Sequence, residues 1–289
     1  MLKKLKKIPH YARKLSKEAY ALDILRLVRH VKPKHWLIAF AAYADRRSTA
    51  VEMTHQLGMQ DIQLLLKILP YREQRLAKNF YLWRYGNRTF CATYMQFIGI
   101  YAEYLSGLFD NLYECEWENK AVLDIGGFVG DSALYFLEKG ASQVIIYEPL
   151  AENVVSLKYN LQPFTNKISI HQQAVAKEEG VLNLSSNTPG GSLGFGMEKG
   201  SYQIQCEGTT WKHILKQHRI DIAKIDCEGG EQYLVDVPAT DLQAISYWII
   251  ETHSPEIDAQ VRKKFQESGF DLIKEVTLTP LVRLLHFKK

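Results

Sequence analysis

The chain has 289 residues, of which 46% are hydrophobic and 24% are charged, both ordinary values for a folded globular protein. This composition excludes a wholly disordered chain, a collagen and a disulfide-stabilised miniprotein, and the length fits one large domain or two modest ones. The four cysteines are scattered with no CxxC pair, which argues against a disulfide framework or a structural zinc site and favours a reducing compartment.

Charge is unevenly distributed along the chain. Residues 1–36 carry eleven Lys and Arg against two acids, a local net charge of +9, so the remaining residues sum to −5 within a total of +4. Apolar residues recur at spacings near three and four within residues 1–31, which predicts an amphipathic helix with a basic opposite face. This helix either packs on the body of the protein or lies on an anionic membrane surface.

The first 115 residues are otherwise dominated by helical spacing, and we expect a mostly helical region there. The longest uncharged apolar run near the start of the chain, residues 36–44, is nine residues long, whereas a membrane-spanning helix needs about 20. The charged stretch before this run is too long for a signal peptide, so we expect an unprocessed cytoplasmic protein, peripheral on the inner membrane face if residues 1–31 bind lipid. Residues 49–69 have a helix–glycine turn–helix pattern that fits helix packing, a homodimer contact or DNA reading, and their few Lys and Arg argue against DNA.

Residues 116–289 alternate short β-rich runs with helical stretches, a pattern typical of an α/β fold with a doubly wound parallel sheet. A β-rich insertion is expected at 179–207. The predicted strands are 120–125, 143–147, 168–173, 220–225, 245–251 and 281–287, and the predicted helices lie near 130–139, 151–161, 209–218 and 256–267.

A glycine-rich turn follows the first of these strands, in the sequence VLDIGGFVGD (122–131). Glycine allows a positive φ and lets a ligand approach the backbone without meeting a Cβ. A nicotinamide-type G-x-G-x-x-G would need glycine at position 125, where the chain has Ile125, so the dinucleotide fingerprint is absent. The remaining D-x-G-x-x-x-G places Asp124 where it suits a ligand with a cationic amine.

Acidic residues end the next strands as well. Glu148, followed by Pro149, stands where an acid accepts hydrogen bonds from ribose hydroxyls in doubly wound folds, although a surface carboxylate is the alternative. The third strand leads to Ala174 and Val175, whose backbone we place at an adenine edge on strand order alone.

The fourth strand ends in KIDCEGGE (224–231), which places three carboxylates within six residues at a sheet edge where ligands bind. Crowded acids indicate a cation, a proton transfer or polar substrate groups, and helix capping is the alternative. His253, after the fifth strand, is a candidate base or cation ligand, with capping before Pro255 as the alternative.

The segments VLDIGGFVGDSALYF, YEPLAENVVSLKYNL, the GGS loop, KIDCEGGE and WIIETH together resemble the FkbM-type S-adenosylmethionine-dependent methyltransferases, over residues 116–289. The resemblance implies the class I methyltransferase fold, a Rossmann-like sheet of seven strands with one antiparallel strand near the C-terminus, and methylation of hydroxyl oxygens on sugars or polyketide-like natural products. The usual KIDVEGAE of the family differs here at Cys227 and Gly230, and both changes keep the acids.

By this resemblance, the chain is expected to methylate a hydroxyl of a glycan or other small-molecule acceptor, with Asp226 or His253 as base. A divalent cation would also lower the pKa of the hydroxyl, but no spacing demands one and no metal ligands are assigned. The expected substrate contacts are Ser192, Glu228, Glu231 and Glu251. The expected contacts to S-adenosylmethionine are Asp124, Gly126, Gly127, Phe128, Gly130, Asp131, Glu148, Pro149, Ala174, Val175 and Asp226.

Two rival functions belong to other classes. A catalytically silent Rossmann-like scaffold or membrane-tethering protein would show degenerate motifs, whereas these motifs are intact. A nicotinamide oxidoreductase is disfavoured by Ile125. A nucleic-acid acceptor is disfavoured because the body of the chain is acidic.

Overall fold

The computed structural model describes residues 71–75, 80–85, 88–105, 107–186 and 202–289. The chain divides into two compact units, residues 1–111 and 112–289, which are described separately. The basic segment 1–31, the pattern at 49–69 and Ser192 lie outside the described residues. Within the described part, no helix is both long enough and apolar enough to cross a bilayer.

The described part of the first unit contains an antiparallel sheet of three strands in the order β1-β2-β3. Trp83 of β2 is wholly buried, stacks on Phe97 with 4.3 Å between ring centroids and donates its indole N–H to the carbonyl of Ala92 at 2.9 Å. Thr93 and Gln96 form a reciprocal capping box that begins the helix after the sheet. The elements are β1 (Tyr71–Arg75), β2 (Tyr81–Tyr85), β3 (Arg88–Ala92), α7 (Tyr94–Ile100), a π-helical turn (Tyr101–Leu105) and α8 (Phe109–Leu112).

The prediction of a mostly helical region before residue 116 is therefore wrong for residues 71–92. Aromatic and β-branched residues, which favour strands, are frequent in YLWRY and RTFCA, and Gly86 and Asn87, residue types typical of turns, lie between these two runs in the sequence. Apolar residues recur at helical spacing in the neighbouring sequence, so the short runs of strand-forming residues in β2 and β3 were not predicted as strands.

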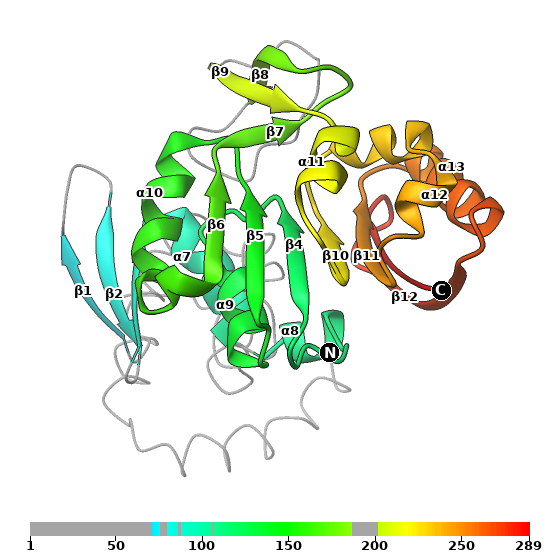
Figure 1. Cartoon of the computed structure of the whole chain (residues 1–289). Coiled ribbons are helices and arrows are strands. Elements are labelled where there is room, and N and C mark those ends of the chain that lie inside the picture. Colours follow the sequence, from blue (N-terminus) through cyan, green and yellow to red (C-terminus); the bar gives the residue numbers. More distant parts are fainter. Residues whose placement is uncertain (1–70, 76–79, 86–87, 106, 187–201) are drawn as a thin grey trace, which may run out of the picture. The chain divides into compact units, whose positions relative to one another are not determined.

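The second unit is built on a sheet of seven strands in the order β12-β13-β11-β10-β4-β5-β6 (Figure 1). Only β13 runs against the other strands of this sheet, because it pairs antiparallel with both β11 and β12 while the remaining pairs are parallel. This is the Rossmann-like class I methyltransferase arrangement that was predicted. The strands are β4 (Ala121–Ile125), β5 (Gln143–Tyr147), β6 (Ile168–His171), β10 (Ile222–Ile225), β11 (Tyr247–Thr252), β12 (Asp271–Thr277) and β13 (Arg283–Lys288).

Helices cover both faces of this sheet. Leu123 and Ile125 of β4 point to the face covered by α11 and α13, where they join a wholly apolar core. The alternate residue, Asp124, points to the other face, where α9 supplies its partner Ser132. The helices are α9 (Asp131–Glu138), α10 (Ala151–Asn160), α11 (Trp211–Gln217), α12 (Ala239–Leu242) and α13 (Pro255–Glu267), with 3-10 segments at Gln162–Lys167 and Gly230–Asp236.

A third sheet, in the order β7-β9-β8, contains the predicted β-rich insertion. Its strands are β7 (Gln173–Val175), β8 (Gly180–Ser186) and β9 (Tyr202–Thr209). The strand predicted at 168–173 is divided between β6 and β7, which belong to different sheets. The other predicted strands and helices are confirmed to within two residues at each end, whereas β12 was not predicted.

Candidate active site

The glycine turn after β4 is packed against the end of β10. A Cβ on Gly126, whose φ is 79°, would overlap the backbone carbonyl of Asp226. A Cβ on Gly127 would overlap the side chain of Ile146 in β5. Phe128 follows with a φ of 44°, an uncommon value for a residue with a side chain. The absence of a side chain at Gly126 and Gly127 therefore lets the turn pack against two neighbouring strands.

Glu148 connects the glycine turn to the end of β5. Its carboxylate is almost fully buried, and Oε2 accepts the N–H of Phe128 at 2.9 Å. Oε1 accepts the N–H of Leu150 at 2.9 Å and the amide of Asn153 at 3.0 Å. Burial raises the pKa of Glu148 to about 7, although these three hydrogen bonds lower it. Because a carboxylate offers about four acceptor positions, Oε2 retains one for a further donor.

Lys224 lies beneath the turn and is 2% exposed. Its ammonium lies 3.3 Å from Asp124 Oδ1 and 3.6 Å from Asp226 Oδ2, and it donates to the carbonyl of Gly126 at 3.1 Å. Burial opposes its charge, but Asp124 and Asp226 outweigh burial and raise the pKa of Lys224 above its usual range. The sequence predicted that Asp124 faces the cationic amine of a bound ligand, whereas the structure places the Lys224 ammonium beside it. Asp124 is wholly buried between Lys224 and Ser132.

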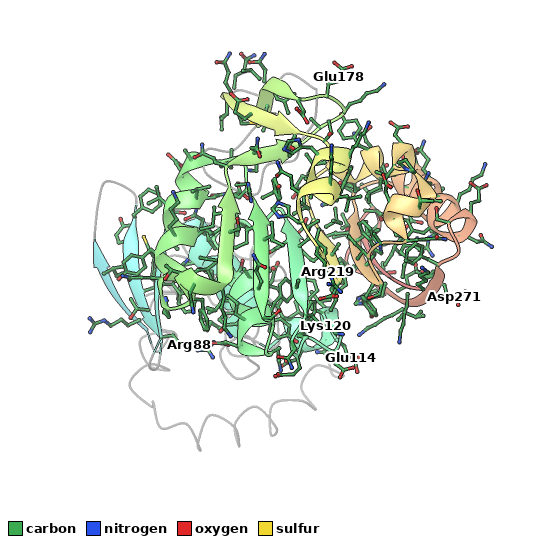
Figure 2. All side chains as sticks on the ribbon, in the orientation of Figure 1. Arg88, Glu114, Lys120, Glu178, Arg219 and Asp271 are labelled. Atoms are coloured by element: carbon green, nitrogen blue, oxygen red, sulfur yellow. The ribbon has the colours of Figure 1, made fainter. Side chains whose placement is uncertain are left out.

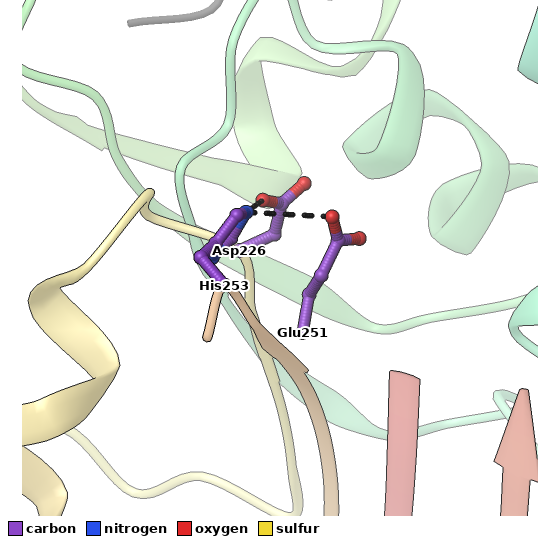
Figure 3. A group of neighbouring side chains, drawn as sticks. All are labelled: Asp226, Glu251 and His253. Atoms are coloured by element: carbon purple, nitrogen blue, oxygen red, sulfur yellow. Dashed lines mark ion pairs between the residues drawn. The ribbon is translucent and has the colours of Figure 1, made fainter. Parts of the chain in front are cut away.

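His253 stands among four carboxylates near the ends of β10 and β11, two of which, Asp226 and Glu251, are drawn in Figure 3. Nδ1 lies 2.9 Å from Glu231 Oε1. Nε2 lies 3.6 Å from Asp226 Oδ1, 3.5 Å from Glu228 Oε2 and 3.4 Å from Glu251 Oε1. The structure therefore gathers Asp226, Glu228, Glu231, Glu251 and His253, which the sequence predicted as catalytic and substrate residues, into one acidic cluster.

The charges within this cluster shift several pKa values. Burial alone would lower the pKa of His253, but its contacts with Glu231 and Glu251 outweigh burial and raise the pKa to about 11. Burial and the neighbouring charge of Asp226 raise the pKa of Glu251 to about 7. Burial likewise raises the pKa of Glu228. The backbone of Glu228 has a φ of 54°, an uncommon value for a residue with a side chain.

The remaining predicted cofactor residues lie around the same edge of the sheet. Gly130 has a φ of 85° and caps α9, and Asp131 begins that helix and is 7% exposed. Pro149 is buried after β5, and Ala174 and Val175 pair with β9. A Cβ on Gly230 would lie 3.3 Å from the carbonyl of Val175, so the end of β7 adjoins the loop after β10.

Lys224 is the residue of this site that sequence reasoning missed. Its signal was a lysine inside an otherwise apolar strand, two residues before Asp226. The orienting role of Glu231 was also missed, because the sequence suggested substrate contact or helix capping for that residue.

Comparisons with known proteins give one family match and a set of solved structures of low sequence identity. The methyltransferase FkbM domain matches residues 124–272. No protein with a curated description matches. Among solved structures, the chain is similar to magnesium protoporphyrin IX methyltransferase from Synechocystis PCC 6803, a structure with bound SAM. The two chains are 14% identical with a TM-score of 0.38, and the match covers 68% of this chain and 83% of the Synechocystis chain. Precorrin 8W decarboxylase from Methanobacterium thermoautotrophicum is 14% identical with a TM-score of 0.41, covering 63% and 88%.

Proposed function

The chain belongs to the FkbM methyltransferase family, and from this premise we propose that it is an S-adenosylmethionine-dependent O-methyltransferase for a hydroxyl of a sugar, glycan or natural-product acceptor. The observation that carries the proposal is the position of Asp226. Its backbone packs against Gly126 of the glycine turn, while its side chain is 31% exposed at the ligand-binding edge of the sheet.

The residues at this edge fit S-adenosylmethionine. Glu148 has a remaining acceptor position on Oε2, which suits a ribose hydroxyl. The turn from Gly126 to Gly130 separates Glu148 from Asp226, so a ligand held by Glu148 would extend along the turn toward Asp226. S-adenosylmethionine supplies, when bound, a methyl group on a positively charged sulfur.

Asp226 is the better placed of the two candidate bases. Both ring nitrogens of His253 face carboxylates, so neither is open to an acceptor hydroxyl. Asp226 is the most exposed carboxylate of the cluster. The Asp226 carboxylate would take the proton of the acceptor hydroxyl, and the hydroxyl oxygen would receive the methyl group that bound S-adenosylmethionine would supply as its carbon–sulfur bond breaks.

We expect Asp226→Asn to reduce methyl transfer at least about 100-fold, because the amide cannot take the proton and general-base catalysis contributes about 10²–10⁴-fold. Binding of S-adenosylmethionine, measured by calorimetry, should change only a few-fold. Turnover is measured as radiolabelled methyl incorporated into hydroxyl-bearing sugar and lipid-linked glycan acceptors.

Asp271→Asn is the matched control. Asp271 begins β12 at the opposite end of the sheet from His253, because its neighbour Lys288 also pairs with Tyr247 at the start of β11 (Figure 2). Turnover that is unchanged in Asp226→Asn would refute the role of Asp226. Wild-type protein that binds neither S-adenosylmethionine nor NAD would favour the silent scaffold instead.

A further inference from the structure

The imidazole of His253 is held in a fixed orientation by Glu231. The Glu231 side chain is wholly buried, and its Oε1 lies 2.9 Å from Nδ1 and accepts the backbone N–H of His253 at 3.1 Å. Its Oε2 accepts the N–H of Gly229 at 2.7 Å. A histidine that ligates a metal almost always has its other ring nitrogen bound in this way, often to a carboxylate.

The opposite ring nitrogen faces oxygen atoms at a spacing that differs from that of hydrogen bonds. Nε2 lies 3.4 Å from Glu251, 3.5 Å from Glu228 and 3.6 Å from Asp226. Charge-assisted N–H···O bonds are about 2.7–2.9 Å long. Two ligand atoms that each lie about 2.1–2.2 Å from one ion in tetrahedral geometry are about 3.4–3.6 Å apart. The distances from Nε2 to the three carboxylate oxygens therefore fit ligands around a shared ion as well as they fit ion pairs.

We propose that Glu251, His253 and the Oδ1 atom of Asp226 bind one divalent transition cation, with Glu228 as a fourth ligand and Glu231 as the residue that orients the imidazole; Oδ2 of Asp226 is then the oxygen left to take the hydroxyl proton. One ligand atom from each of the first three residues lies within 4.8 Å of the others (Figure 3). Their side chains are 15–31% exposed, so an ion can reach them from solvent.

The donor set selects the class of cation. Imidazole suits zinc, iron, nickel and copper, whereas carboxylates suit magnesium, calcium and manganese. A site with one imidazole and two or three carboxylates therefore binds Zn²⁺ more tightly than Mn²⁺ and Mn²⁺ more tightly than Mg²⁺ or Ca²⁺. Coordination of an acceptor hydroxyl by this ion rests on the proposed function, whereas binding of the ion does not.

The test is titration of the full-length, metal-free protein with Mn²⁺, followed by electron paramagnetic resonance of the free ion. We expect one saturable ion per chain. Affinity should fall at least about 30-fold in Glu251→Gln and in His253→Gln, and about 10–100-fold in Glu231→Gln, because the imidazole loses its orienting partner. Glu179→Gln is the matched control, since Glu179 pairs with His213 at 3.0 Å outside this cluster, and it should bind Mn²⁺ within about twofold of wild type.

A measurement on the wild-type protein keeps the proposal testable even if a variant fails to fold. Electron spin echo modulation of bound Mn²⁺ should show coupling to an imidazole nitrogen, as ligation by His253 requires. Absence of that coupling, Mn²⁺ binding that is equal in wild type and Glu251→Gln, or Ca²⁺ binding as tight as Zn²⁺ binding would each overturn the proposal. The Mn²⁺ titration contains neither a methyl donor nor an acceptor. A failure to bind Mn²⁺ would therefore overturn the metal site without contradicting the proposed methyl transfer.

Discussion

Lys224 connects the glycine turn to the acidic cluster through one ammonium group. It contacts Asp124, Asp226 and the carbonyl of Gly126, and it is almost completely buried. The gain from such a buried ion pair offsets the loss of hydration only while both partners are present. Lys224 is therefore needed to keep Asp124 buried. Because it contacts both Gly126 and Asp226, it also fixes the glycine turn relative to the acidic cluster.

We expect Lys224→Met to lower the free energy of unfolding by about 3–5 kcal/mol, because it leaves the charge of Asp124 buried without its partner. Urea denaturation measures this loss. The double variant Lys224→Met, Asp124→Asn should recover part of it, because the amide carries no charge. A single variant within about 1 kcal/mol of wild type would contradict the pairing, as would a double variant less stable than the single one.

The site residues that could be predicted from sequence were those that end a strand. Asp226, Glu148 and His253 follow apolar runs, and parallel strands bring their carboxyl ends to one edge. Lys224 could not be assigned in this way, because its role depends on the register that places it beside Asp124 in the neighbouring strand. The same limit applies to Glu231, whose contact with His253 joins two separate strand ends.

At the scale of elements, prediction succeeded where a strand is buried on both faces. The apolar runs of β4, β5, β10 and β11 are bounded by turn residues and therefore stand out. In contrast, β12 (DLIKEVT) is an edge strand with Leu272 40% and Ile273 51% exposed, and its pairing with β13 contains a register shift. An edge strand has a neighbouring strand on only one side, so the sequence of β12 mixes polar and apolar residues. This mixture removes the apolar run by which the other strands were predicted.

His286 makes the pairing of β13 sensitive to pH. It is wholly buried in that strand, bonded to Tyr247 of β11 at 3.0 Å, and opposite Lys274 of β12. Burial, together with the charge of Lys274, lowers its pKa from 6.5 to about 4. A histidine with a depressed folded pKa contributes stability above its unfolded pKa, and that contribution is lost as the pH falls from 6.5 toward 4.

We therefore expect wild type to lose about 2 kcal/mol of unfolding free energy relative to His286→Gln between pH 7 and pH 5. Urea denaturation of both proteins at each pH gives this difference. The exposed His213, replaced by Gln, controls for general effects of removing a histidine. A difference between wild type and His286→Gln that stays constant from pH 7 to pH 5 would disprove the role of His286.

At the scale of the whole molecule, the charge asymmetry separates the first 36 residues from the family domain. Residues 1–36 sum to +9 and the rest of the chain to −5, and the FkbM match at 124–272 lies entirely in the second part. An anionic surface would attract the first segment and repel the remainder. From this separation we propose that residues 1–31 bring the enzyme to anionic membranes, near lipid-linked acceptors, rather than packing on the protein.

We expect full-length protein to co-sediment with vesicles that contain anionic lipid and not with neutral vesicles, and the bound fraction to fall as salt is raised. Each basic residue near such a surface contributes about 1 kcal/mol, so replacing Lys3, Lys4, Lys6 and Lys7 with Gln should weaken binding at least about 30-fold. The control replaces Lys212, Lys216, Lys263 and Lys264, which lie in α11 and α13 of the second unit. Binding that does not depend on anionic lipid content, or equal losses of binding in the two variants, would rule out a membrane role for residues 1–31 and favour the alternative that their predicted helix packs on the protein.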